Sequence, residues 1–167
     1  MPLLSLVAFT VSGLIGTPLP MPQFTLSDVF LLCVLFFIAA SMEELGWAGY
    51  ATEPLQARFG ALVAGLIIGL VWAIYHFIPL IQADRSVEWI AWWALGTVAV
   101  RVFMVALYNA AGGSIFIVTL FHMTQNVSWQ LYPVRGSHYD PQLFSVLFVI
   151  MAVIGVIILI QPSGRAE

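Results

Sequence analysis

The chain consists mainly of long apolar runs, separated by short stretches that hold prolines, glycines and charges. Apolar residues follow one another without alternation in runs such as 29–40 and 144–160, which indicates helices and argues against the strands of a membrane barrel. Six apolar segments are recognisable, at about 3–16, 28–50, 60–80, 87–109, 114–131 and 141–160. We therefore predict an all-α, polytopic transmembrane helix bundle built from about six apolar segments.

The stretches between these segments carry recognisable start and stop signals for helices. Three prolines within 18–22 end the first segment, which is short for a full span, and Thr25 to Asp28 offer an N-cap for the second. A glycine pair in 110–113 closes the fourth segment. No linker, low-complexity tract or repeat divides the chain, so we predict a single membrane-embedded domain over residues 1–167.

Composition narrows the class of protein further. Hydrophobic residues make up 62% of the chain, charged residues only 8%, and the mean hydropathy is +1.02, which excludes an ordinary soluble domain. The lipid bilayer is therefore the first expected partner, and without a basic stripe no nucleic acid is expected. If every segment spans, Arg58 and Arg165 fall on one side and Arg85 and Arg135 on the other, so charge gives no orientation.

Five polar side chains lie inside or at the edge of apolar runs. They are Glu43, Glu44, His76, His122 and Asn126. A charge at the centre of a membrane helix costs roughly 2.5 to 3.5 kcal/mol on an insertion scale, so such groups face one another or a water-filled cavity. We predict a polar site inside the bundle. The plainer interpretation is that the glutamates are solvated at a helix end and that the histidines only join helices.

Neighbouring charges suggest how the glutamates are divided. Glu43 and Glu44 point about 100° apart on a helix, so one can face a cavity while a nearby donor holds the other. Arg101 lies well inside the fourth apolar segment, where an unpaired guanidinium is costly. We expect Arg101 either to pair with one of these carboxylates or to extend to the nearer membrane interface.

The other polar residues form pairs at helical spacing. Trp72 and His76 are four residues apart and share a helix face, and so do His122 and Asn126. An imidazole beside a carboxamide is a donor pair suited to an oxyanion. Gln125 lies on another face and is expected to join helices.

Four short motifs occur in order on these segments. Glu43–Tyr50 reads Glu-Glu-Leu-Gly-Trp-Ala-Gly-Tyr, Trp72–His76 reads Trp-x-x-x-His, Tyr108–Ser114 is a Tyr-Asn-x-x-Gly-Gly-Ser turn, and His122–Asn126 reads His-x-x-x-Asn. Together they resemble the CPBP family of intramembrane proteases, the CAAX prenyl-protease and bacteriocin-processing group also called the ABI domain. The resemblance covers about residues 28–131. The family's second motif is Phe-x-x-x-His, and Trp72 occupies the phenylalanine position here.

The resemblance implies an intramembrane endopeptidase that hydrolyses a peptide bond with a glutamate-activated water. Glu43 would be the general base and His76 would orient the water, while His122 and Asn126 would donate to the oxyanion and Glu44 would support them. The implied substrate is a peptide or membrane protein, whether or not it is prenylated. The implied location is the plasma membrane of a bacterium or archaeon, where the chain would be a multi-pass protein.

One departure from the family pattern concerns an arginine. The first family motif is Glu-Glu-x-x-x-Arg, and Ala48 occupies the arginine position here. Arg101 is our candidate replacement from another helix. Without a replacement, the chain would be an inactive relative that acts as a membrane immunity or scaffold protein. A transporter or proton relay is a third option, although segments 3–16 and 141–160 contain no ionisable residue for a continuous path.

A metal mechanism is the alternative to the metal-free one. Glu43, Glu44, His76 and His122 are residue types that bind zinc. The chain has no His-Glu-x-x-His sequence, and Asn126 is a poor zinc ligand. We therefore expect no cofactor, with zinc as the alternative.

Overall fold

The structure is a computed structural model that describes residues 1–159, in which helices are joined by turns and no strand occurs. The elements are α1 (Pro2–Leu14), α2 (Leu26–Gly46), the π-helical turn η1 (Trp47–Ala51), α3 (Thr52–Phe59), α4 (Ala61–Tyr75), α5 (Phe77–Gln82), α6 (Val87–Ala110), α7 (Ile115–Leu131) and α8 (Pro141–Leu159). The prediction of an all-α fold is confirmed. Residue 160, where the last predicted segment ends, and Arg165 lie outside the described residues.

Three helical stretches are long and apolar enough to cross a membrane, Leu26–Phe59, Ala61–Gln82 and Val87–Ala110. Many large apolar side chains are exposed on the outer faces, including Leu35 at 53%, Leu70 at 55% and Ile154 at 51%. An apolar exterior of this extent fits lipid tails. The chain therefore has the character of an integral membrane protein.

The structure differs from the prediction at two places. α3 was not predicted, because its sequence is polar and contains Pro54; proline is tolerated there because it lies in the first turn. The third predicted segment is broken into α4 and α5 at His76. Pro79 explains the break, since it has no N–H to give to the carbonyl four residues earlier.

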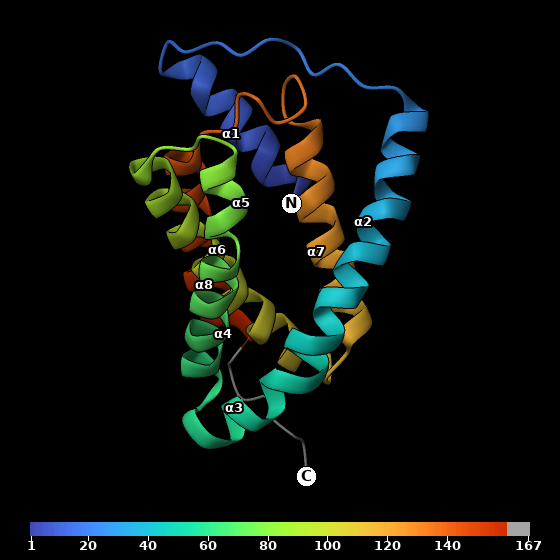
Figure 1. Cartoon of the computed structure of the whole chain (residues 1–167), viewed down its shortest axis with the longest axis vertical. Coiled ribbons are helices and arrows are strands. Elements are labelled where there is room, and N and C mark those ends of the chain that lie inside the picture. The colour runs from blue at the N-terminus through green and yellow to red at the C-terminus, as the bar shows by residue number, and fades with distance from the viewer. Residues whose placement is uncertain (160–167) are drawn as a thin grey trace.

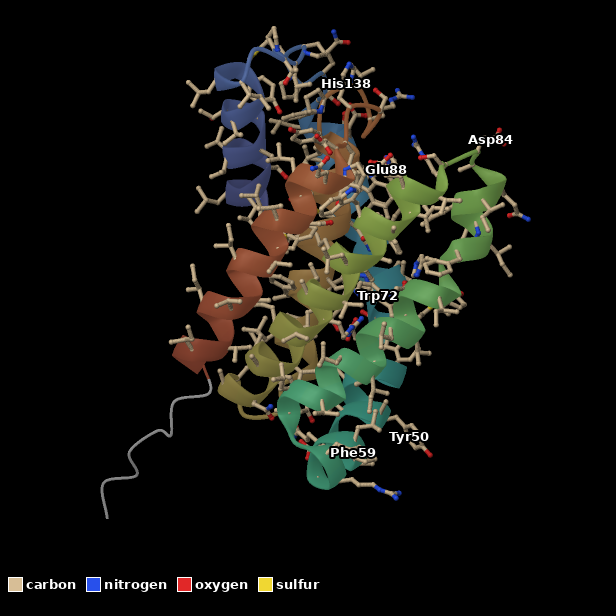
Figure 2. All side chains as sticks on the ribbon, turned by 90° about the vertical axis from the view of Figure 1, so that its left-hand side faces the viewer. Tyr50, Phe59, Trp72, Asp84, Glu88 and His138 are labelled. Carbon is tan, nitrogen blue, oxygen red and sulfur yellow. The ribbon has the colours of Figure 1, made fainter. Side chains whose placement is uncertain are left out.

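The helices form two groups in Figure 1. α2 packs along α7 on one side, while α4 packs on α6 and α6 packs on α8 on the other. α1 contacts α7 and α8 near one end, and α3 lies at the other end between α2 and α4. Figure 2 places Trp72 at mid-height, with Asp84, Glu88 and His138 towards one end and Tyr50 and Phe59 towards the other.

The start of α2 is fixed by the cap that the sequence predicted. The Thr25 backbone N–H donates to Asp28 Oδ2 at 2.8 Å, and the Asp28 N–H donates to the Thr25 hydroxyl at 3.2 Å. This reciprocal capping box satisfies two backbone donors at the helix end. The cap sets where α2 begins and hence which face carries Glu43 and Glu44.

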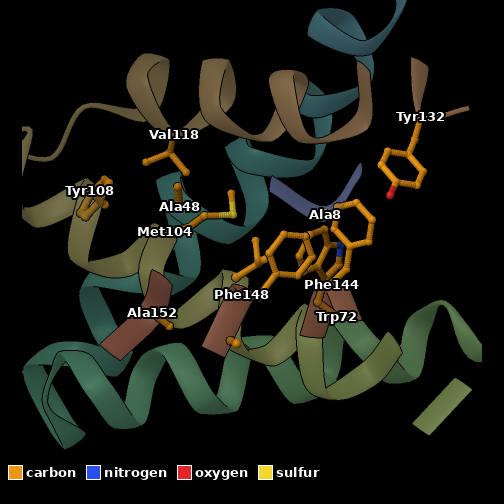
Figure 3. Packing of buried hydrophobic residues seen from close by; sticks show 12 residues of the cluster. Ala8, Ala48, Trp72, Met104, Tyr108, Val118, Tyr132, Phe144, Phe148 and Ala152 are labelled. Carbon is orange, nitrogen blue, oxygen red and sulfur yellow. The ribbon is translucent and has the colours of Figure 1, made fainter. Parts of the chain in front are cut away.

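Buried side chains join the two groups of helices. Figure 3 shows Trp72 next to Phe148, with Phe144 close by, whereas Ala48, Met104 and Val118 lie together in another part of the cluster. The apolar cluster therefore surrounds polar residues that belong to the same helices.

Two glycines let α4 approach α6 closely. A Cβ atom on Gly65 would lie 2.9 Å from Val102 Cα, and one on Gly69 would lie 2.9 Å from Val98 Cα. Small residues four apart are a common basis for close packing of membrane helices. This contact brings Trp72 on α4 and Arg101 on α6 into one layer.

We predict that Gly69→Ala destabilises the protein and that Gly13→Ala does not. Alanine in a helix gains about 0.5 to 1 kcal/mol over glycine, and nothing lies within 4 Å of a Cβ on Gly13. At Gly69 overpacking against backbone should cost about 1 to 3 kcal/mol and outweigh that gain. Thermal unfolding in detergent would measure both variants, and an unfolding temperature for Gly69→Ala at or above that of the unmodified protein would contradict the close contact.

Candidate active site

The candidate residues gather around a cavity of about 220 Å³. Its lining includes Glu43 from α2, Trp72 from α4, His76 at the break after α4, and His122, Gln125 and Asn126 from α7. Four of the five predicted site residues therefore share one cavity, and the two groups of helices both contribute. Glu44 is absent from the lining and lies behind it.

Glu43 is held by one of its two carboxylate oxygens. The indole Nε1–H of Trp72 donates to Glu43 Oε2 at 2.9 Å. Glu43 is half-buried, whereas the adjacent Glu44 is fully buried. The two glutamates therefore differ as the sequence predicted, one at the cavity and one held by donors.

The helix break orients His76. Its backbone N–H donates to the Ala73 carbonyl at 3.1 Å, the spacing of a tightened last turn. The ring Nδ1 lies 2.8 Å from the Trp72 carbonyl, which can only accept, so Nδ1 carries the proton in this contact. In the neutral ring Nε2 is then an acceptor that is free of this bond.

Glu44 accepts hydrogen bonds from two partners. Arg101 Nη1 donates to Glu44 Oε2 at 2.8 Å and Arg101 Nη2 donates to Oε1 at 2.9 Å, a bidentate pair in which both residues are almost inaccessible. His122 Nδ1 lies 2.8 Å from Glu44 Oε1. The expectation that Arg101 pairs with a motif glutamate is confirmed, and the alternative that it extends to the membrane interface is wrong.

Ala48, at the position of the motif arginine, is part of the buried apolar cluster. Its side chain is 2% exposed and belongs to the apolar cluster with Met104 and Val118. In this chain a guanidinium reaches Glu44 from Arg101 on α6. Glu44 consequently keeps a cationic partner although the motif arginine is missing.

The contact of His122 with Glu44 limits what the ring can do. A carboxylate accepts, so Nδ1 carries the proton and Nε2 of the neutral ring is an acceptor. His122 can donate from Nε2 only when both ring nitrogens carry a proton. Asn126, one turn further along α7, supplies a carboxamide to the same cavity in any protonation state.

Reasoning from the sequence missed parts of the site. Gln125 lines the cavity next to Asn126, so the prediction that it lies on another face and joins helices is wrong. In the described part of the chain, Gln125 Oε1 and Ser128 Oγ are buried without a hydrogen-bond partner. The spacing of Gln125 was the available signal, because positions three residues apart are neighbours on a helix surface, whereas Ser128, six residues after His122, lies about 120° away around the helix.

The grouping of possible metal ligands is sparse. Within residues 1–159, no three His, Cys, Asp or Glu side chains are placed so that they could hold a metal ion together. Glu44 is committed to Arg101 and His122. A His₂-carboxylate zinc site with one open position, the alternative considered from the sequence, would therefore require these side chains to move.

Comparison with known proteins gives two matches. Residues 25–128 match the family model described as type II CAAX prenyl endopeptidase, Rce1-like. The chain is also 28% identical over 141 residues to a protein of Methanococcus maripaludis named CAAX prenyl protease 2, a match that covers 77% of this chain and 50% of the relative. The chain thus spans about half the length of that curated relative.

Proposed function

The chain belongs to the Rce1-like family of type II CAAX prenyl endopeptidases, and from this premise we propose that it is an intramembrane endopeptidase. The proposed reaction is hydrolysis of a peptide bond by a water that Glu43 activates. The observation that carries the proposal is the common cavity of Glu43, His76, His122 and Asn126, in which Glu43 is anchored by Oε2 and His76 by Nδ1. Glu43 Oε1 and His76 Nε2 thereby remain free for the reaction.

The proposed mechanism begins with a water between Glu43 and His76. Glu43 takes a proton from the water while the oxygen of the water attacks the scissile carbonyl carbon. His76 Nε2 accepts a hydrogen bond from the water and so orients it for the attack. The carbonyl oxygen gains the negative charge. The Asn126 carboxamide donates to it, and so does His122 when its ring is doubly protonated.

Collapse of the tetrahedral intermediate completes the reaction. The C–N bond breaks, and the proton held by Glu43 passes to the leaving amine. The second proton of the water stays on the new carboxylic acid, so that one water is consumed and a carboxylic acid and an amine are formed. Glu44 and Arg101 do not touch the substrate in this scheme. Glu44 holds His122 through Nδ1, and Arg101 holds Glu44 and balances its negative charge.

The proposed substrate is a peptide or protein that is itself held at the membrane. The Methanococcus maripaludis relative is named for prenylated CAAX substrates, and a prenylated carboxyl-terminal cysteine peptide is therefore the first substrate to test. The proposed location is a bacterial or archaeal plasma membrane with a multi-pass arrangement, which the apolar helices and the archaeal relative support. The second candidate is a non-catalytic immunity or scaffold protein; the Arg101–Glu44 pair favours the endopeptidase, because Glu44 has a cationic partner although Ala48 stands at the motif position.

The test is cleavage by the purified protein in liposomes. We expect it to cleave a prenylated peptide, or a membrane-anchored peptide without a prenyl group, and the pair of substrates identifies which anchor is required. Failure to cleave any anchored peptide, with folded protein, would favour the non-catalytic alternative.

We also predict that the activity resists chelators. The proposed water is activated by a carboxylate and an imidazole, so incubation with a zinc chelator followed by its removal should leave the rate unchanged. Loss of activity that returns on adding zinc would instead support the metal mechanism.

A further inference from the structure

Trp72 contacts four of the charged or titratable side chains of the site. Its indole Nε1–H donates to Glu43 Oε2 at 2.9 Å, and its carbonyl accepts from His76 Nδ1 at 2.8 Å. The Arg101 guanidinium carbon lies 4.3 Å from the centroid of its ring, and the ring meets His122 edge-on with centroids 5.1 Å apart. Trp72 is only 4% exposed, so packing fixes these contacts.

From these contacts we infer that Trp72 is a positioning residue, one that assigns different roles to the two oxygens of Glu43. Oε2 is occupied by the indole N–H, so Oε1 is the oxygen that receives the proton from water. This inference rests on the proposed endopeptidase function and adds to it. It concerns a residue for which the matching motif of the family has phenylalanine, a side chain with no N–H.

The same residue also ties the base to the imidazole. One side chain holds Glu43 and one backbone carbonyl of the same residue holds His76, so the spacing between the two groups is set within a single residue of α4. The ring in turn rests against Arg101, which is held by Glu44. A reactive geometry that depends on small displacements benefits from such a short chain of contacts.

The test compares Trp72→Phe with the unmodified protein. Phenylalanine keeps an aromatic ring and the backbone carbonyl for His76. It removes the hydrogen bond to Glu43 together with part of the buried ring volume. We expect kcat to fall about tenfold or more, as for a lost hydrogen bond to a charged group, with KM little changed and a lower unfolding temperature from the smaller ring. Trp89→Phe, on α6 and outside the cavity lining, is the matched control and should keep full activity.

A second measurement does not depend on proteolysis. The chain has six tryptophans, so ¹⁵N labelling gives a small set of indole N–H signals, and the one lost in Trp72→Phe is that of Trp72. We expect this signal to move when Glu43 is replaced by glutamine, a weaker acceptor, and to stay in place in Glu88→Gln.

The two measurements separate the inference from the proposed function. Full activity in Trp72→Phe, with activity lost in Glu43→Gln, would overturn the role of Trp72 and leave the endopeptidase intact. An indole signal that ignores Glu43→Gln would overturn it as well, even if no substrate were cleaved. If Trp72→Phe fails to fold, the signal that disappears in a Trp72→Tyr variant is that of Trp72, and its response to Glu43→Gln decides the matter.

Discussion

Replacing Arg101 with leucine should lower the free energy of unfolding by about 3 to 5 kcal/mol, the range measured when one partner of a buried ion pair is removed. The reason is the charge that is left behind. Glu44 is fully buried, and in the described structure its cationic partner is Arg101, 2% exposed, at 2.8 and 2.9 Å. Without the guanidinium, the His122 contact alone cannot offset the desolvation of a carboxylate.

Chemical or thermal unfolding in detergent would measure this loss, and two variants sharpen it. Arg58→Leu, an exposed arginine on α3 that contacts Phe59, is the matched control and should change stability little. Glu44→Gln combined with Arg101→Leu should recover part of the loss, because the amide keeps an acceptor for His122 without a buried charge. Equal stabilities of Arg101→Leu and Arg58→Leu would contradict the pairing.

Replacing Glu43 with glutamine should reduce the rate of peptide cleavage by about 10²- to 10⁴-fold, the usual contribution of a general base. The amide is nearly the same size as the carboxylate and can still accept the Trp72 N–H through its oxygen, so the fold should persist. Glu43 also lacks the arginine contact that Glu44 has, so its charge contributes little to stability.

The cleavage assay in liposomes would measure the effect on kcat, with unfolding temperature as a check on folding. Glu88→Gln is the matched control, since Glu88 lies in the first turn of α6 at one end of the bundle and away from Trp72 (Figure 2). We expect it to keep the full rate. A Glu43→Gln protein that is folded and as active as Glu88→Gln would remove Glu43 from the role of base.

The helical architecture could be predicted because long apolar runs and polar breaks specify it directly. The cap at Thr25 and Asp28 was visible in the sequence for the same reason, since it depends on residues three apart. The pairing of Arg101 with Glu44 was predicted from the free-energy cost of an unpaired charge in the membrane, because few partners exist for a guanidinium within an apolar helix.

Other features depend on contacts that the sequence does not encode locally. The indole N–H of Trp72 reaches Glu43 across 29 positions of sequence, so only the tertiary arrangement of α2 and α4 reveals it. The π-helical turn η1 and the polar helix α3 follow from tertiary packing of a stretch with weak helical signals. The place of Gln125 in the cavity depends on how α7 is rotated about its axis.

The central claim is that water, activated by Glu43, attacks the substrate directly. The most direct measurement is mass spectrometry of products formed in H₂¹⁸O, with hydroxylamine present to trap any acyl-enzyme. The account predicts a new carboxylate that carries one ¹⁸O, no hydroxamate product, and loss of both product and label in Glu43→Gln. A hydroxamate, or labelled product at an undiminished rate from the glutamine variant, would contradict it.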